Sequence, residues 1–234
     1  MIYAIIGRRE QGKTTLACTM ARKLDIRVIV DPRGMIDPVR GSHRVTRIEH
    51  LDVAFDCITD GVESEIVITP DVKLKDMFAE TCEQLRTIVK TAPSMRLAIL
   101  FDECRFFDLE ACEAFDWLLR CVPRRSMHIL LTCHRPVDLP PNVRAIVDQW
   151  MMFRCTQEHD LALIAKLCKI DVATKVAMLP DHHFIQWDDG KSIAYVHDDP
   201  SVWYLAMSCD REGYESAPDR DMPRSTLTEK RRLF

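Results

Sequence analysis

The chain has 234 residues, of which 47% are apolar and 29% charged, so it is long enough to bury the core of one large α/β domain without disulfide bonds. Its formal net charge of −4 excludes a uniformly basic protein but not a local basic surface. No run of about 18 apolar residues occurs, so we expect no membrane-spanning helix. The ten cysteines include no Cys-x-x-Cys pair, and we expect free thiols rather than a zinc site.

Short apolar runs alternate with segments of helical spacing. Strands are predicted at Ile2–Ile6, Arg27–Val30, Glu65–Thr69, Leu97–Phe101, Met127–Thr132 and Gln149–Arg154. Helices are predicted over residues 13–24, 73–91, 109–121 and 157–169, the third capped by Asp108. Phe184–Trp187 and Ser192–Val196 are predicted to pair as a hairpin through Asp189 and Gly190.

This alternation predicts an α/β fold of three layers, in which helices flank a mainly parallel central sheet that ends in a C-terminal β-hairpin. Residues 32–64 are expected to hold loops and a short element or two. We expect residues 1–207 to form the folded domain. The polar, basic stretch 208–234 is expected to be a mobile tail.

A glycine-rich motif follows the first predicted strand. Residues 7–14 match the phosphate-loop (P-loop) pattern G-x-x-x-x-G-K-[ST] at each fixed position, and an amphipathic helix is predicted to follow. The alternative is a chance match, but the position directly after a buried strand favours a P-loop NTPase. Main-chain amides and Lys13 are then expected to bind the phosphates of ATP, and the Thr14 hydroxyl to bind Mg²⁺. The predicted ATP-binding residues are Gly7, Arg8, Arg9, Glu10, Gln11, Gly12, Lys13, Thr14 and Thr15.

Two carboxylates follow the apolar run Leu97–Phe101. Asp102 and Glu103 are expected at the carboxyl edge of the sheet, where ligands bind in open α/β folds. Asp102 is expected to hold Mg²⁺, and Glu103 to act as the general base on the attacking water. The alternative is a strand that simply ends in two solvated acids. A carboxylate at the second position favours hydrolysis over transfer to another molecule.

A third polar segment, Thr132-Cys133-His134-Arg135-Pro136, ends another apolar strand. The order of the P-loop, Leu100-Phe101-Asp102-Glu103 and this segment resembles the FtsK–HerA superfamily of DNA-pumping ATPases. The short chain is similar to the genome-packaging ATPases of membrane-containing icosahedral viruses, as are the strand Val28–Val30 with Asp31-Pro32 and the strand end at Phe153-Arg154. The resemblance covers roughly residues 1–196.

The resemblance implies roles for further residues. The family usually has Gln where His134 stands; His134 is expected to donate to a phosphate oxygen, or else to be a structural residue at a strand end. Family members form rings, commonly hexamers, in which a neighbouring subunit supplies an arginine to the γ-phosphate. The candidates here are Arg124, Arg125, Arg144 and Arg154, each of which is otherwise a solvated surface residue.

The resemblance also implies a function, namely an ATP-driven motor that moves double-stranded DNA, in this case into a viral capsid. Arg40, Arg44 and Arg47 are candidates for the DNA-facing lining, with a solvated loop as the alternative. A capsid or membrane vertex protein is a further expected partner, and the expected location is the host cytoplasm or the virion. The other functions considered are a phage-assembly ATPase of the zonula-occludens-toxin type, a nucleotide or small-molecule kinase, and a nucleotide switch.

Overall fold

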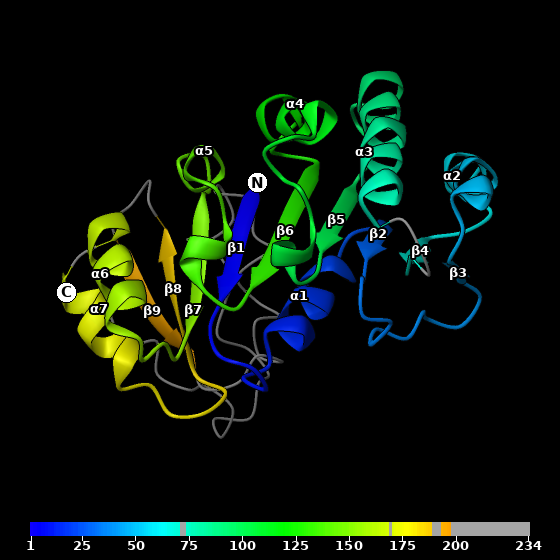
Figure 1. The fold of residues 1–234 in the computed structure, drawn as a ribbon. Helices are drawn as coiled ribbons and strands as arrows, with labels where there is room; N and C mark the ends of the chain where they lie inside the picture. The colour runs from blue at the N-terminus through cyan, green and yellow to red at the C-terminus, as the bar shows by residue number, and fades with distance from the viewer. Residues whose placement is uncertain (71–73, 169, 189–192, 198–234) are drawn as a thin grey trace, which may run out of the picture.

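The computed structural model describes residues 1–70, 74–168, 170–188 and 193–197. It contains one nine-stranded sheet in the order β3-β4-β2-β5-β6-β1-β7-β8-β9 (Figure 1). The strands from β3 to β7 pair in parallel, and β8 and β9 join antiparallel at one end. The predicted mainly parallel sheet with a C-terminal hairpin is therefore confirmed. The turn at residues 189–190 and the predicted tail 208–234 lie outside the described residues.

The strands are β1 Ile2–Ile6, β2 Ile26–Val30, β3 His43–Val45, β4 Glu65–Ile68, β5 Leu97–Phe101, β6 Met127–Cys133, β7 Gln149–Phe153, β8 Phe184–Asp188 and β9 Ile193–His197. The α-helices are α1 Lys13–Ala21, α2 Leu51–Thr59, α3 Leu74–Thr91, α4 Glu113–Cys121, α5 Pro141–Arg144, α6 Glu158–Leu167 and α7 Ile170–Ala177. Three short 3₁₀ helices are η1 Ile48–His50, η2 Cys104–Phe106 and η3 Pro136–Asp138.

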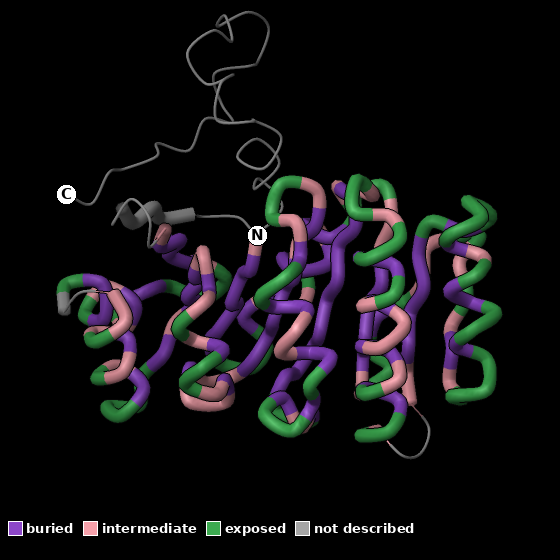
Figure 2. Tube along the Cα trace, turned by 90° about the horizontal axis from the view of Figure 1, so that it is seen from above, coloured by how far each residue is buried: buried purple, intermediate pink, exposed green. Residues whose placement is uncertain are grey.

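The core consists of two apolar layers, one on each face of the sheet. Helix α1 packs on one face against alternate residues of the central strands, among them Ile5, Leu100 and Leu130. Helices α2, α3, α4, α6 and α7 cover the other face, which contains the larger cluster. Figure 2 shows the strands between these layers as buried along most of their length. The three-layer arrangement follows because strands buried on both faces need apolar side chains in both directions.

The structure corrects one predicted helix cap and shows three helices that were not placed from the sequence. Helix α4 begins at Glu113 with Cys112 at its N-cap, so Asp108 does not cap it; Asp108 instead pairs with Lys75 on the surface. The segment 32–64 contains helix α2, whose inward residues recur at helical spacing as Leu51, Ala54, Phe55 and Ile58. Helices α5 and α7 were not predicted.

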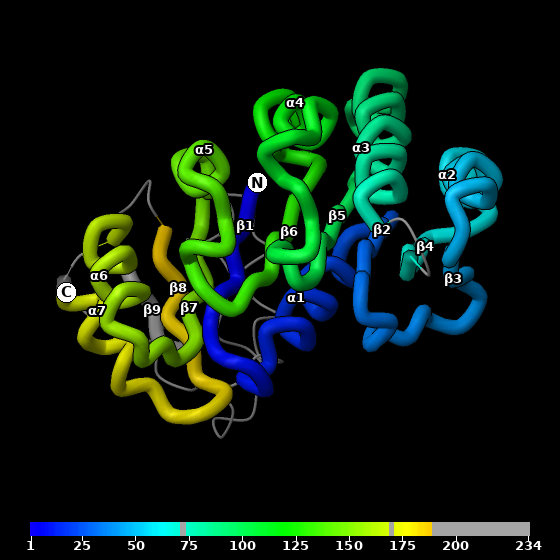
Figure 3. Tube along the Cα trace, viewed as in Figure 1, coloured from blue at the N-terminus to red at the C-terminus, as the bar shows by residue number. Residues whose placement is uncertain are grey.

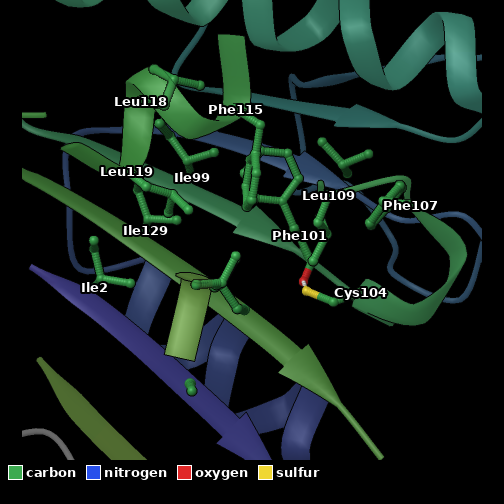
Figure 4. Packing of buried hydrophobic residues seen from close by; sticks show 14 of the residues in the cluster. Ile2, Ile99, Phe101, Cys104, Phe107, Leu109, Phe115, Leu118, Leu119 and Ile129 are labelled. Carbon is green, nitrogen blue, oxygen red and sulfur yellow. Dashed lines mark hydrogen bonds between the residues drawn. The ribbon is translucent and has the colours of Figure 1, made fainter. Parts of the chain in front are cut away.

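Aromatic side chains fix the carboxyl end of β5 against α3 and α4. The ring of Phe101, the last residue of β5, lies 5.5 Å from that of Phe78 and 5.4 Å from that of Phe115. Phe107 stacks on Phe78 with the ring centroids 4.8 Å apart. Figure 4 shows Phe101, Phe107 and Phe115 gathered around this strand end. The packing holds in place the point at which the chain leaves the sheet.

The strand order determines which polar residues meet. Strand β6 lies between β5 and β1, and the parallel register aligns Ile6 with Cys133 and Phe101 with Leu131. The segments that follow β1, β2, β5 and β6 therefore emerge at the same edge of the sheet, which is the lower edge in Figure 3. Among the described residues, none of the helices combines the length and the hydropathy needed to span a bilayer.

Candidate active site

The P-loop has a backbone that only glycine tolerates at its first position. Gly7 has a φ of +144°, and a Cβ placed there would lie 2.5 Å from Cβ of Phe153 on β7. Gly12 has a φ of +92° at the N-cap of α1, and Glu10 adopts a φ of +60°, which is uncommon for a residue with a side chain. The loop therefore curls tightly between strand and helix, as a phosphate cradle requires.

The side of the loop toward β7 is anchored to the segments around β7 and β8. The amide of Arg8 donates to the carbonyl of Arg154 (3.3 Å), and Nε2 of Gln11 donates to Oδ1 of Asp181 (2.9 Å). Arg154 forms an ion pair with the same carboxylate. The hydrogen bond from Gln11, with the nearby charge of Arg154, lowers the pKa of Asp181. Arg154, a candidate arginine for a neighbouring subunit, is thus held beside the P-loop of its own chain.

Lys13 lies at the centre of the site. Its ammonium donates to the carbonyl of Arg8 (2.7 Å) and lies 3.3 Å from Nδ1 of His134. Burial lowers the pKa of Lys13, and the charge of Glu103 opposes that shift. A buried ammonium that bonds to a loop carbonyl is available to exchange this partner for a phosphate oxygen, which is a stronger, charged acceptor.

Asp102 connects the P-loop helix with two strands. Its Oδ1 atom accepts hydrogen bonds from the hydroxyls of Thr14 (3.0 Å) and Thr132 (2.6 Å). Asp102 is only 3% exposed, and burial raises the pKa of its carboxyl despite these two hydrogen bonds. A buried carboxylate next to a hydroxyl offers the hard oxygen ligands that Mg²⁺ prefers. The residues present therefore fit a magnesium ion.

Glu103 adopts an unfavourable backbone conformation, with φ +54° and ψ +58°. Such a conformation persists at functional sites when the surroundings hold it. Its amide donates to the hydroxyl of Thr132 (2.9 Å), and its Oε1 atom pairs with Arg33 (3.4 Å). Its Oε2 atom lies 3.0 Å from Nε2 of His134 and 3.5 Å from Nε of Arg105. Oε2 is buried without a hydrogen-bond partner.

His134 lies between Lys13 and Glu103. Burial is the main cause that lowers the pKa of His134, and the ammonium of Lys13 adds to it, so the ring is neutral at pH 7. The ammonium donates, so we assign Nδ1 as the acceptor and the ring proton to Nε2, on the side of Glu103. A glutamine side chain would present the same two groups, a carbonyl acceptor and an N–H donor.

The structure thus brings Lys13, Thr14, Asp102, Glu103 and His134 together at one edge of the sheet. In the P-loop, Gly7 and Gln11 are buried, Gly12 and Thr14 are half-buried, and the exposed members are Arg8, Arg9, Glu10 and Thr15. Arg124, Arg125 and Arg144 lie at the opposite edge. Arg124 pairs there with Asp148, whose carboxylate accepts from the amide of Ile2 at the start of β1. Helix α5, which carries Arg144, lies at the same edge of the sheet as the N-terminus (Figure 1).

Sequence reasoning missed several residues of the site. Thr132 was noted only as part of a strand end, although its hydroxyl contacts both acids. Its position directly after the apolar run was the available signal. Arg33, Arg105 and Asp181 carried no signal, because nothing in their spacing relates them to Glu103 or to Gln11.

No protein-family model and no curated protein matches the sequence. Among solved structures, the genome packaging NTPase B204 from Sulfolobus turreted icosahedral virus 2 in complex with AMPPCP matches with a TM-score of 0.68 and 20% identity, over 85% of this chain and 97% of that chain. The DNA-packaging ATPase B204 from Sulfolobus turreted icosahedral virus matches with a TM-score of 0.64 and 21% identity, over 85% and 97% of the two chains. The expected P-loop NTPase fold is therefore confirmed.

Replacing Asp102 by Asn is expected to stabilise the ligand-free protein. Because burial raises the pKa of Asp102, the folded chain binds this proton more tightly than the unfolded chain does, and ionisation costs stability. We expect Asp102→Asn to raise Tm by about 2 °C or more at pH 8. The gain should shrink as the pH falls toward about 4, the ordinary pKa of Asp.

Thermal unfolding across this pH range checks the expectation, with Asp25→Asn, whose side chain is 67% exposed, as the control. Adding Mg²⁺ with a non-hydrolysable ATP analogue should raise the Tm of the wild-type protein more than that of Asp102→Asn, so that the wild type becomes the more stable of the two. A variant that is less stable than the wild type at pH 8 without ligand would contradict this account of Asp102.

Replacing His134 by Gln is expected to reduce the loss of stability in mild acid. Because the pKa of folded His134 is lowered, the unfolded chain takes up this proton first, and stability falls as the pH drops below about 6.5. Glutamine keeps the acceptor and the donor but does not titrate. Thermal unfolding at pH 7.5 and 5.5 should show a smaller decrease in Tm for His134→Gln than for the wild type. Equal decreases in the two proteins would show that His134 does not titrate in this way.

Proposed function

We propose that this protein binds ATP with Mg²⁺, hydrolyses it, and uses the energy to move double-stranded DNA, as in the packaging of a viral genome. The observation that carries the hydrolytic part is the convergence of Lys13, Thr14, Asp102 and Glu103 at one edge of the sheet. The tight P-loop and the N-terminus of α1 supply main-chain amides for the phosphates.

In this proposal each residue has a separate role. Lys13 binds the β- and γ-phosphates, giving up its contact with the carbonyl of Arg8. Thr14 and Asp102 hold the metal, which supplies positive charge against the developing charge on the phosphates. Glu103 accepts the proton of the attacking water at Oε2, its buried oxygen without a hydrogen bond. His134, whose Nε2 atom lies 3.0 Å from Oε2 of Glu103, donates its Nε2 proton to the γ-phosphate when ATP is bound.

The proposed transport of DNA is supported by the fold and by exposed arginines. The fold is shared with a genome packaging NTPase and a DNA-packaging ATPase of known structure. Of the three arginines considered for a DNA-facing surface, Arg44 is occupied within the protein, where it bonds to Thr69 and to the carbonyl of Ile36. Arg40 and Arg47 are exposed, and Arg47 pairs with Glu49 on the surface. The DNA-facing role is therefore proposed for Arg40 and Arg47.

A ring, commonly a hexamer, is part of this proposal, with a neighbour supplying an arginine to the γ-phosphate. Arg124, Arg125 and Arg144 suit this role better than Arg154, because they lie away from the P-loop of their own chain. A capsid or vertex protein as a partner, and a place in the host cytoplasm or the virion, belong to the same proposal.

ATP turnover by two site variants and two control variants tests the hydrolytic roles. Lys13→Ala should lose ATP binding and turnover together. Glu103→Gln should bind ATP with a Kd within about threefold of the wild type, while kcat falls about 10²- to 10⁴-fold, the range for loss of a general base. Lys75→Ala and Glu49→Gln, whose side chains are 74% and 63% exposed, are the matched controls. Near-normal turnover by Lys13→Ala would contradict the role of the P-loop.

The effect of duplex DNA on the ATPase rate distinguishes a DNA motor from the other functions considered. We expect duplex DNA to raise the ATPase rate of the wild-type protein several-fold, with a salt dependence that reflects phosphate contacts. Arg40→Ala should weaken this stimulation without changing the basal rate. Phosphate transfer to a small acceptor would identify a kinase, and hydrolysis unaffected by DNA would favour a nucleotide switch or an assembly ATPase that does not move DNA.

A further inference from the structure

The two carboxylate oxygens of Glu103 have different surroundings. Oε1 pairs with Arg33, whose Nη1 atom lies 3.4 Å away. Oε2 lies on the side of His134 and Arg105 and is buried without a hydrogen bond. Because His134 also contacts Lys13, Oε2 faces the part of the site in which the γ-phosphate is proposed to bind. The ion pair with Arg33 therefore fixes the oxygen that is turned away from the reaction.

Arg33 lies in the loop between β2 and β3, whose backbone is held by hydrogen bonds. The carboxylate of Asp31, which is fully buried, accepts hydrogen bonds from the amides of Arg33 (3.1 Å) and Ile36 (2.7 Å). Gly34 has a φ of +67°, which permits the turn between these two amides. Ile36 is 4% exposed and packs in the same apolar layer as α1. The backbone on both sides of the arginine is thus held by a single acid.

Two further buried contacts fix the rest of this loop. Arg44 donates to the carbonyl of Ile36 (2.7 Å) and to the hydroxyl of Thr69 (2.6 Å), which follows β4. Glu65, fully buried in β4, accepts from the amide of Val39 (2.9 Å). The loop is therefore tied to the sheet along its length, and the guanidinium of Arg33 extends from a fixed frame.

We propose that Arg33 is a positioning residue for ATP hydrolysis, which acts by holding Oε1 of Glu103 so that Oε2 is aimed at the attacking water. This inference rests on the proposed role of Glu103 as the general base. A side chain on an unfavourable backbone needs such a restraint, because φ +54° is not a conformation that glutamate prefers. Arg33 itself contacts Glu103 and is assigned no contact with the nucleotide.

Arg105 is less suited to this role, although it also faces Glu103. It lies in η2, directly after Glu103 in the chain, and its guanidinium is 4.8 Å from the ring centroid of Phe106. It therefore moves with the backbone that it would have to restrain. Arg33 comes from the loop after β2 and therefore provides a reference outside that backbone. The charged and titratable groups around Glu103 are Arg33, Arg105, His134, Lys13 and Asp102.

Steady-state ATP turnover of Arg33 variants tests this inference. Arg33→Ala should lower kcat about 5- to 30-fold while KM for ATP stays within about twofold, because a misaligned base affects the chemical step and not the binding of the nucleotide. Arg33→Lys, which keeps the charge, should recover at least a third of the wild-type kcat. Met35→Ala, from the same loop and 70% exposed, controls for the loop. Arg96→Ala, which removes an exposed ion pair with Asp25, controls for the loss of charge, and both should match the wild type.

Thermal unfolding of each variant shows whether it is folded before its turnover is compared. A normal kcat for Arg33→Ala beside an inactive Glu103→Gln would overturn this inference and leave the proposed function intact. A rise in KM at unchanged kcat would overturn it as well, since Arg33 would then bind the nucleotide. A Glu103→Gln protein that hydrolyses ATP at the wild-type rate would overturn the proposed function, and the role of Arg33 with it.

Discussion

One carboxylate oxygen joins three segments of this chain that lie far apart in sequence. Oδ1 of Asp102 accepts hydrogen bonds from Thr14, which opens α1, and from Thr132, near the end of β6. These bonds fix the P-loop helix, β5 and β6 relative to one another at the edge of the sheet. Because the carboxylate is buried, its ionised form is costly without a cation. The same constraint therefore builds the site and favours a metal within it.

The other titratable groups of the site, Lys13, His134 and Glu103, contact one another. Buried Lys13 and buried Glu103 flank a neutral His134, which has one ring nitrogen toward Lys13 and the other toward Glu103. The ammonium of Lys13 bonds to a main-chain carbonyl of the P-loop. This arrangement keeps each charged group near a partner before ATP enters. A glutamine could make the same two contacts as His134, since both side chains provide one acceptor and one donor.

Much of the fold and part of the site were predictable from the sequence. Apolar runs such as Leu97–Phe101 give strands that are buried on both faces, and the glycines at 7 and 12 allow the backbone of the P-loop. The helix over residues 51–59 was visible in its apolar spacing, although only a short element or two was expected somewhere in residues 32–64. The partners of Glu103 were not predictable, because Arg33 meets it across 70 residues through a loop whose shape depends on buried bonds to Asp31 and Glu65.

The most direct test of the site is an experimental structure of the protein with Mg²⁺ and a non-hydrolysable ATP analogue. The account predicts that the triphosphate lies in the curl of residues 7–14 and that the metal lies between the Thr14 hydroxyl and the Asp102 carboxylate. It further predicts that Lys13 leaves the carbonyl of Arg8 for the phosphates. A nucleotide bound at another edge of the sheet, or a metal beyond the reach of Asp102, would contradict it.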